Sequence, residues 1–104
     1  MKVPILLPNI FNHPFTYESD MSLGPGDYVV VPFGKSKITG VVWDEFEKKN
    51  NRDFKIKTVL KKLNVTPLKK TTIKFLNWFA EYNIIPKGMA LKLVLLSGNA
   101  IEKL

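Results

Sequence analysis

The chain has 104 residues, of which 45% are hydrophobic and 24% charged, and a net charge of +7, which fits one folded domain and excludes a disordered segment. With no cysteine and one histidine, His13, it excludes disulfides, thiolate metal sites and a cysteine nucleophile, so no metal or cofactor is expected. No apolar run reaches the roughly 18 residues that span a bilayer, and the start MKVPILLP lacks a signal-peptide pattern, so a cytoplasmic location is expected.

The first two-thirds of the chain are expected to form strands. Short apolar or aromatic runs predict five of them, at Lys2–Leu7, Phe15–Glu18, Asp27–Phe33, Ile38–Trp43 and, with imperfect alternation, Lys55–Leu63. The sequence GPGD at 24–27 predicts a turn before the third strand, and residues 34–37 close the hairpin between the third and fourth. On the second strand, Phe15 and Tyr17 share one face, which is either a core face or a surface for stacking bases.

The last third of the chain changes to the period of a helix. Either Thr71 or Thr72 is expected to cap the first helix with its hydroxyl. One stripe along the helix is marked by Ile73, Leu76, Ala80 and Asn83. Aromatic residues widen it, namely Phe75, Trp78, Phe79 and Tyr82. Because aromatic side chains on such a stripe are usually buried, Phe75, Leu76 and Phe79 are expected in the core, with stacking on bases as the alternative.

A second helix is predicted to begin at Pro86, with Met89, Leu93 and Leu96 on one face, and to end at Ser97–Asn99. Five short strands followed by two helices indicate a mainly β, α+β fold. We expect a small five-stranded, barrel-like curled sheet with the two C-terminal helices packed on one side. Residues 1–97 form this domain, and residues 98–104 are expected to start a linker.

The positive charge belongs to one segment. Between Lys48 and Lys74 lie ten basic residues and one acid, Asp53, a net charge of +9 that leaves −2 for the rest of the chain. Lysines gathered in this way neutralise phosphates and release counterions when a polyanion binds. The segment therefore favours a nucleic-acid partner, with a solvated lysine-rich face as the alternative.

Catalytic motifs are not supported. Gly34-Lys35-Ser36 looks like the end of a phosphate-binding loop, but Val29 stands where that loop requires a glycine. A hairpin tip carrying Lys35 and Lys37 is the better interpretation. The carboxylates Glu45 and Glu47 lie in a charged loop, where they stay solvated, so the chain is not expected to be an enzyme.

Five segments of the sequence follow one another as they do in a known family. They are LPNIFNHPFTY, GDYVVVPFGK, ITGVVW, FKIKTVLKKL and WFAEYNIIPKG. Their order and spacing resemble the amino-terminal DNA-binding domain of PriA-type replication-restart helicases, over nearly the whole chain. The resemblance implies a binding module that performs no chemistry, holds the 3′ end of the leading strand at stalled forks, and reads little base sequence. The implied partners are DNA, the helicase regions downstream of the linker and primosome proteins. No membrane partner is implied.

The resemblance also implies a pocket for the terminal nucleotide, which leaves no room for a phosphate after the 3′ hydroxyl. Its residues would be Phe15, Thr16, Tyr17, Gly34 and Lys57, and the hairpin lysines Lys35 and Lys37 add to the DNA-binding set. Thr16 departs from the family, where an aspartate is common, and a hydroxyl is a weaker acceptor that can also donate.

A second hypothesis from another class stays open. GDYVVVPFG followed by GVV is also typical of an SH3-like small-barrel interaction module of the transcription or translation machinery. The C-terminal third separates the two hypotheses, because a bare small barrel needs neither the aromatic helix nor the helix that Pro86 begins.

Overall fold

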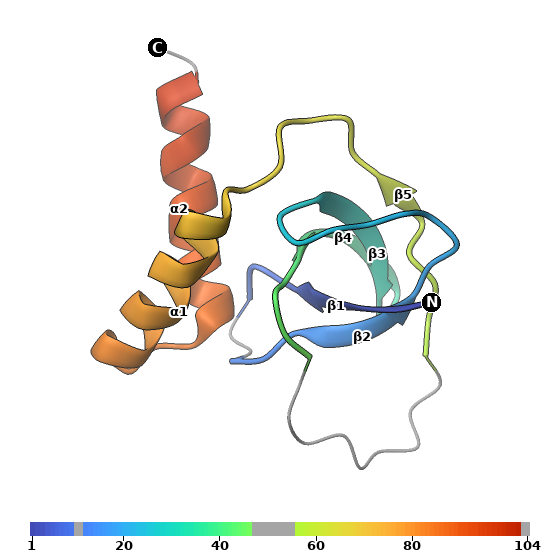
Figure 1. The fold of residues 1–104 in the computed structure, drawn as a ribbon, viewed down its shortest axis with the longest axis horizontal. Helices are drawn as coiled ribbons and strands as arrows, with labels where there is room; N and C mark the ends of the chain where they lie inside the picture. The colour runs from blue at the N-terminus through green and yellow to red at the C-terminus, as the bar shows by residue number, and fades with distance from the viewer. Residues whose placement is uncertain (10–11, 47–55, 103–104) are drawn as a thin grey trace.

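The apolar runs of the sequence build a curled sheet with a core on each of its faces. The structure, a computed structural model, describes residues 1–9, 12–46 and 56–102. Its elements are β1 (Lys2–Leu6), β2 (Phe15–Glu18), β3 (Tyr28–Phe33), β4 (Ser36–Val42), β5 (Lys61–Lys62), α1 (Lys70–Asn83) and α2 (Lys87–Glu102). The two helices lie together on one side of the sheet (Figure 1). The predicted fold class is confirmed.

The strands are ordered β2-β1-β4-β3-β5, and all neighbours in this sheet are antiparallel. A two-residue turn joins β3 to β4, since Phe33 is paired with Ser36. Gly34 in this turn has a φ of 61°, while Lys35 keeps a negative φ, as in a type II′ turn. Glycine is favoured at Gly34 because a side chain at positive φ is strained.

Alternation along the strands divides the apolar side chains between the two cores. The inner core, enclosed by the curled sheet, contains Val3, Ile5, Leu7, Tyr17, Val29, Val31, Val42 and Val59. The outer core lies between the sheet and the helices and contains Leu6, Val41, Trp43, Ile73, Leu76, Ala80, Ala90 and Leu91. Successive residues of β1, such as Ile5 and Leu6, thus point to opposite cores, which explains why that run is continuously apolar.

The helices are held on the sheet by a polar contact as well as by packing. The indole Nε1 of buried Trp43 donates a hydrogen bond of 2.9 Å to Oδ1 of Asn77 on α1. Because a buried indole N–H needs an acceptor, this bond fixes the rotation of α1 over the end of β4. No helix in the described part of the chain has the length and apolar character needed to cross a membrane.

The predicted fifth strand, Lys55–Leu63, is wrong in its extent. Lys55 lies outside the described residues, and within the rest only the two residues of β5 and one bridge, Thr58 to Glu18, pair with other strands. The reason is a change of partner: residues 57–59 bond to β2, whereas residues 60–63 bond to β3. A segment that crosses between two strands cannot keep one alternation, so Val59 is buried although it shares parity with the lysines.

Helix α1 differs from the prediction at its start and on its wide aromatic face. Its N-cap is Lys69, without a side-chain hydrogen bond, so Thr71 and Thr72 lie inside the first turn and do not cap it. Ile73, Leu76 and Ala80 are buried as predicted, whereas Asn83 is exposed.

The placement of the aromatic residues in the core is wrong for Phe75, which is 50% exposed, and holds only in part for Phe79, which is half-buried. Trp78 and Tyr82 are 57% and 67% exposed, so they do not widen the buried stripe either. The contact of α1 with the sheet is narrow enough for Ile73, Leu76 and Ala80 to fill it.

Helix α2 is rotated relative to the prediction. Ala90 and Leu91 are buried, whereas Leu93 is 52% exposed, and the side chain of Leu96 lies outside the described ones. The predicted end at Ser97–Asn99 is also wrong, since the helix continues to Glu102. Glycine lowers helix stability by only about 1 kcal/mol relative to alanine, and no proline follows to end the helix. The linker assigned to residues 98–104 stays a prediction.

The end of α1 stores backbone strain. Ile84 follows the helix at φ 54° and ψ 47° and is 91% exposed, although a β-branched residue is disfavoured in this left-handed conformation. We expect Ile84→Gly to raise the free energy of unfolding by about 1 kcal/mol, because glycine relieves the strain while little burial is lost.

Urea denaturation of the two proteins measures this effect. Ile85→Gly is the matched control: it removes a half-buried side chain that packs on the outer core and should lower stability. A lower unfolding free energy for Ile84→Gly would contradict the assignment of strain.

Candidate nucleic-acid interface

The three predicted pocket residues of β2 lie on two faces of that strand. Tyr17 belongs to the inner core and Phe15 packs against it, so alternation directs Thr16 to the opposite, outer face, where it is half-buried. The side chain of Thr16 is therefore available on the outside of an edge strand. Phe15 and Tyr17 support that strand from within.

Tyr17 connects β2 to the far edge of the sheet. Its hydroxyl donates a hydrogen bond of 2.9 Å to the carbonyl oxygen of Pro32. Because the two-residue turn makes Phe33 and Ser36 a hydrogen-bonded pair, the carbonyl of Pro32 points away from β4 and can accept this bond. Burial raises the pKa of the Tyr17 hydroxyl, which keeps its proton for donation.

This bond completes a row of satisfied carbonyl groups along β3. The N–H of Leu63 donates to Tyr28 at 2.8 Å, and the N–H of Leu60 donates to Val30 at 2.9 Å. At Pro32 the chain that supplied these donors has turned away to β2, and the Tyr17 hydroxyl takes its place. A side chain thus does here what an adjacent strand does elsewhere.

Phe15 brings β2 close to the hairpin tip. Its ring meets the ring of Phe33 edge-on, with centroids 5.7 Å apart. The centroid of the His13 ring lies 5.0 Å from that of Phe15. Gly34 follows Phe33 directly and is exposed, and a Cβ added to Gly34 would have no atom within 4 Å. The backbone beside Phe15 is therefore open to a ligand.

Lys57 reaches β2 through its backbone. The N–H of Glu18 donates to the carbonyl of Lys57 at 2.9 Å, and Val59 returns a bond of 2.8 Å to Glu18. The side chain of Lys57 is exposed. Lys57 therefore lies beside β2, the strand that carries Thr16, at the end where Glu18 stands.

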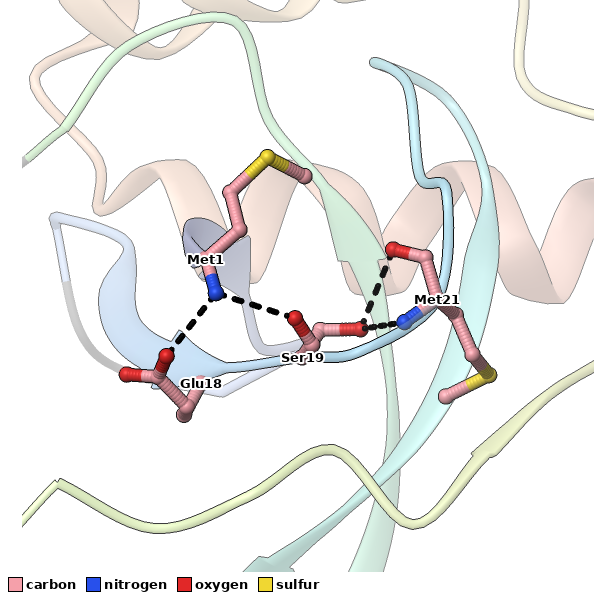
Figure 2. Close-up of polar contacts among 4 residues, drawn as sticks. All are labelled: Met1, Glu18, Ser19 and Met21. Atoms are coloured by element: carbon pink, nitrogen blue, oxygen red, sulfur yellow. Dashed lines mark hydrogen bonds and ion pairs between the residues drawn. The ribbon is translucent and has the colours of Figure 1, made fainter.

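Glu18, whose backbone bonds to Lys57, already has an ionic partner for its side chain. Figure 2 shows the ammonium group of Met1 beside Glu18 and Ser19, at 2.8 Å from Oε1 of Glu18 and 3.1 Å from the carbonyl of Ser19. The hydrogen bond from this ammonium group, and then its charge, lower the pKa of Glu18. The carboxylate of Glu18 is thereby paired away from Lys57.

The hairpin lysines differ from Lys62 of β5 in whether they form an ion pair. Lys35 lies at the tip and Lys37 on β4, both exposed, and neither forms an ion pair with any residue that the structure describes. Lys62, by contrast, lies 3.7 Å from Asp27. Among the residues that the structure describes, no acid is paired with the lysines of the hairpin or with Lys57, so positive charge remains at both places.

The structure brings most of the predicted residues together. Direct contacts join Phe15 and Tyr17 to the end of β3 next to Gly34, and backbone bonds join Lys57 to β2. Prediction from sequence missed Pro32 and Phe33, whose contacts make this junction. The motif VPFGK contains both residues and was the available signal.

A hollow of about 490 Å³ lies elsewhere, between the end of α1 and the start of α2. It is lined by Asn12, Ala80, Glu81, Ile84, Ile85, Pro86 and Lys87, and by none of the seven predicted site residues. Its acid, Glu81, would repel a phosphate, and its lysine, Lys87, is already paired with Glu45, so this hollow is a poorer candidate for DNA than the β2–hairpin surface.

A curled sheet with an open hairpin beside an edge strand, and unpaired lysines at both, defines a small nucleic-acid-binding module. The family model described as the 3′ DNA-binding domain of PriA matches residues 2–96. The chain belongs to this family and is therefore a DNA-binding domain. This favours the DNA-binding hypothesis over an SH3-like interaction module, in agreement with the two helices.

Curated relatives carry the same domain. The chain is 35% identical over 97 residues to the replication restart protein PriA of Rickettsia conorii, a match that covers 88% of the chain and 14% of that protein. It is 34% identical over 95 residues to the proteins of the same name from Rickettsia typhi and Rickettsia prowazekii, with the same coverage. The chain thus spans about one seventh of the length of these relatives.

We expect Tyr17→Phe to lower the free energy of unfolding by about 1 kcal/mol, because the carbonyl of Pro32 loses its donor while the packing of the ring is kept. Chemical denaturation measures the change. Tyr82→Phe is a control, since it removes a hydroxyl from a side chain of α1 that is 67% exposed and keeps that ring. An unchanged stability of Tyr17→Phe would show that the hydroxyl does not hold the sheet edge.

Proposed function

We propose that this domain holds the 3′-terminal nucleotide of a DNA strand on the outer face of β2, between Lys57 and the hairpin tip, largely without regard to base sequence. In this proposal it serves the remaining regions of a replication-restart helicase and the primosome proteins that act with it. A bacterial chromosome is replicated in the cytoplasm, which is therefore the location we propose.

The observation that carries this proposal is the junction of β2 with the hairpin. The Phe15–Phe33 contact and the bond from Tyr17 to Pro32 fix the open backbone of Gly34 relative to the edge strand that carries Thr16. In this proposal the junction bounds the site on one side, so that a terminal nucleotide is admitted and the further phosphate of a strand that continues is excluded.

Each predicted residue has a role in this binding mode. Lys57 supplies charge for the phosphate of the terminal nucleotide, and Lys35 and Lys37 for phosphates further along the strand. The hydroxyl of Thr16 can donate to or accept from the terminal base, which suits a site that discriminates weakly among bases. Phe15 and Tyr17 act by holding the strand in position, since their rings are engaged in the inner core.

We expect the chain to bind single strands and forks with a free 3′ hydroxyl at least several-fold more tightly than the same DNA with a 3′ phosphate. The added phosphate would need space that the proposed site does not leave beyond the 3′ hydroxyl. Fluorescence anisotropy with the dye at the 5′ end compares the two ligands under one salt concentration. Moving the phosphate to the 5′ end is the control for its charge, and equal affinities for both 3′ ends would refute end recognition.

Lys57→Ala is expected to weaken binding to a 3′-hydroxyl strand by roughly tenfold and to reduce the salt dependence by about one phosphate contact, because a cation in the site is lost. The matched control is Lys92→Ala, which removes an exposed lysine of α2 outside the basic segment. Affinity measured over a range of salt concentrations separates the two. If both substitutions have the same effect, the site does not lie at Lys57.

A further inference from the structure

Helix α1 exposes three large aromatic side chains that neither the fold nor the proposed 3′-end site uses. Phe75, Trp78 and Tyr82, here called the aromatic stripe, are 50%, 57% and 67% exposed. Spacings of three and four residues place them on one face of the helix. The buried residues of the helix, among them Leu76, occupy the opposite face, so the stripe is directed away from the sheet.

The rings of the aromatic stripe are ordered by contact with one another. Trp78 and Tyr82 are stacked with centroids 5.1 Å apart and planes 8° apart, and Phe75 lies 5.9 Å from Trp78. Exposed aromatic residues contribute little to burial, and an apolar group of this size on a protein surface commonly marks a binding site. Mutual stacking holds these rings ready for a ligand at low entropic cost.

The charge around the aromatic stripe is positive. Residues 56–83 contain six lysines and one acid, Glu81, which is a net charge of +5 around the stripe. Lys70 and Lys74 are exposed on α1, which has no acid in its first turn, and neither forms an ion pair within the described ranges. Like charges four residues apart destabilise a helix slightly, and a bound anion would offset the repulsion between Lys70 and Lys74. Lys74 also stands four residues before Trp78, beside it on the helix surface.

We propose that the aromatic stripe, with Lys70 and Lys74, is a second contact site for single-stranded DNA, in which bases stack on the rings and phosphates meet the lysines. Aromatic faces accept any base, and cations beside them track the backbone, which gives binding without sequence preference. A second copy of the chain is a poorer occupant, because it would bring Lys70 and Lys74 towards the same lysines of its partner.

The two DNA contacts are joined by a basic path. From Lys57 the chain passes through β5 and crosses above the sheet to α1 (Figure 1), and it carries exposed Lys61 and Lys69 on the way. This inference rests on the proposed function for the class of ligand, and it differs in needing unpaired bases and no strand end. A strand whose terminus is held at β2 can thus extend over the surface towards α1.

Tryptophan fluorescence reports on this site. Trp78 is exposed, whereas the other tryptophan, Trp43, is 1% exposed, so a base that stacks on the surface quenches the emission of Trp78. The probe is a single-stranded oligonucleotide with a 3′ phosphate, which disfavours the site at β2. We expect it to quench the exposed tryptophan, while an abasic oligomer of the same length, which offers phosphates without bases, quenches little.

The variant Trp78→Ala/Tyr82→Ala tests affinity, and we expect it to bind the 3′-phosphorylated strand about tenfold more weakly, the scale of lost base stacking. Phe46→Ala is the matched control, because Phe46 is a 48% exposed aromatic residue outside the stripe. Thermal unfolding should show that both variants are folded. The preference for a 3′ hydroxyl should persist in the stripe variant, which separates this inference from the proposed function.

Unchanged affinity of the folded stripe variant, together with no quenching by the single strand, would overturn the proposal. Loss of self-association in that variant without loss of DNA binding would also overturn it, in favour of a protein contact. Equal affinities for the two 3′ ends, with quenching retained, would refute end recognition and leave the second contact supported.

Discussion

The carbonyl groups along the edge of β3 need hydrogen-bond donors, and the fold of this small domain depends on how they find them. A five-stranded sheet has two edges, and here the chain from Lys57 to Leu63 bonds first to β2 and then to β3, which draws the edges towards each other. The segment is too short to pair with both strands along their length. The Tyr17 hydroxyl satisfies the carbonyl of Pro32 that the segment leaves behind, so a buried side chain completes the curl that the backbone begins.

The same contacts that curl the sheet also position the candidate site. Closing β2 towards β3 packs the ring of Phe15 edge-on against that of Phe33, and Gly34 comes next in the chain. The change of partner that shortens the fifth strand leaves Lys57 on the edge of β2 with its side chain in solvent. Stability and binding therefore share residues, and substitutions at Phe15 or Tyr17 report on both. Thr16 and Lys57 face outward and report on binding more directly.

Helix α1 combines two different surfaces in four turns. Small and branched side chains, Ile73, Leu76 and Ala80, meet the sheet, and the hydrogen bond from Trp43 to Asn77 sets the rotation of the helix. That rotation turns the large aromatic residues to solvent, next to Lys70 and Lys74, which form no ion pair with an acid in the described part of the chain. The domain thus presents basic charge over a path that begins at the edge of β2 and ends on α1, which suits a ligand that is long, flexible and anionic.

The sequence by itself determined the fold class, the first four strands to within two residues and the position of the basic segment, because alternation, turn chemistry and charge are local properties. It also named the residues that meet at β2 and the hairpin, through a resemblance to a family to which the chain does belong. Only the tertiary structure decided which face each residue uses. Phe75 matches a core position by spacing but is exposed, since the contact between α1 and the sheet is narrow. Val59 breaks the alternation of its segment but is buried, since its backbone changes partner there. In both cases burial follows from what packs opposite a residue, and a local pattern does not contain that information.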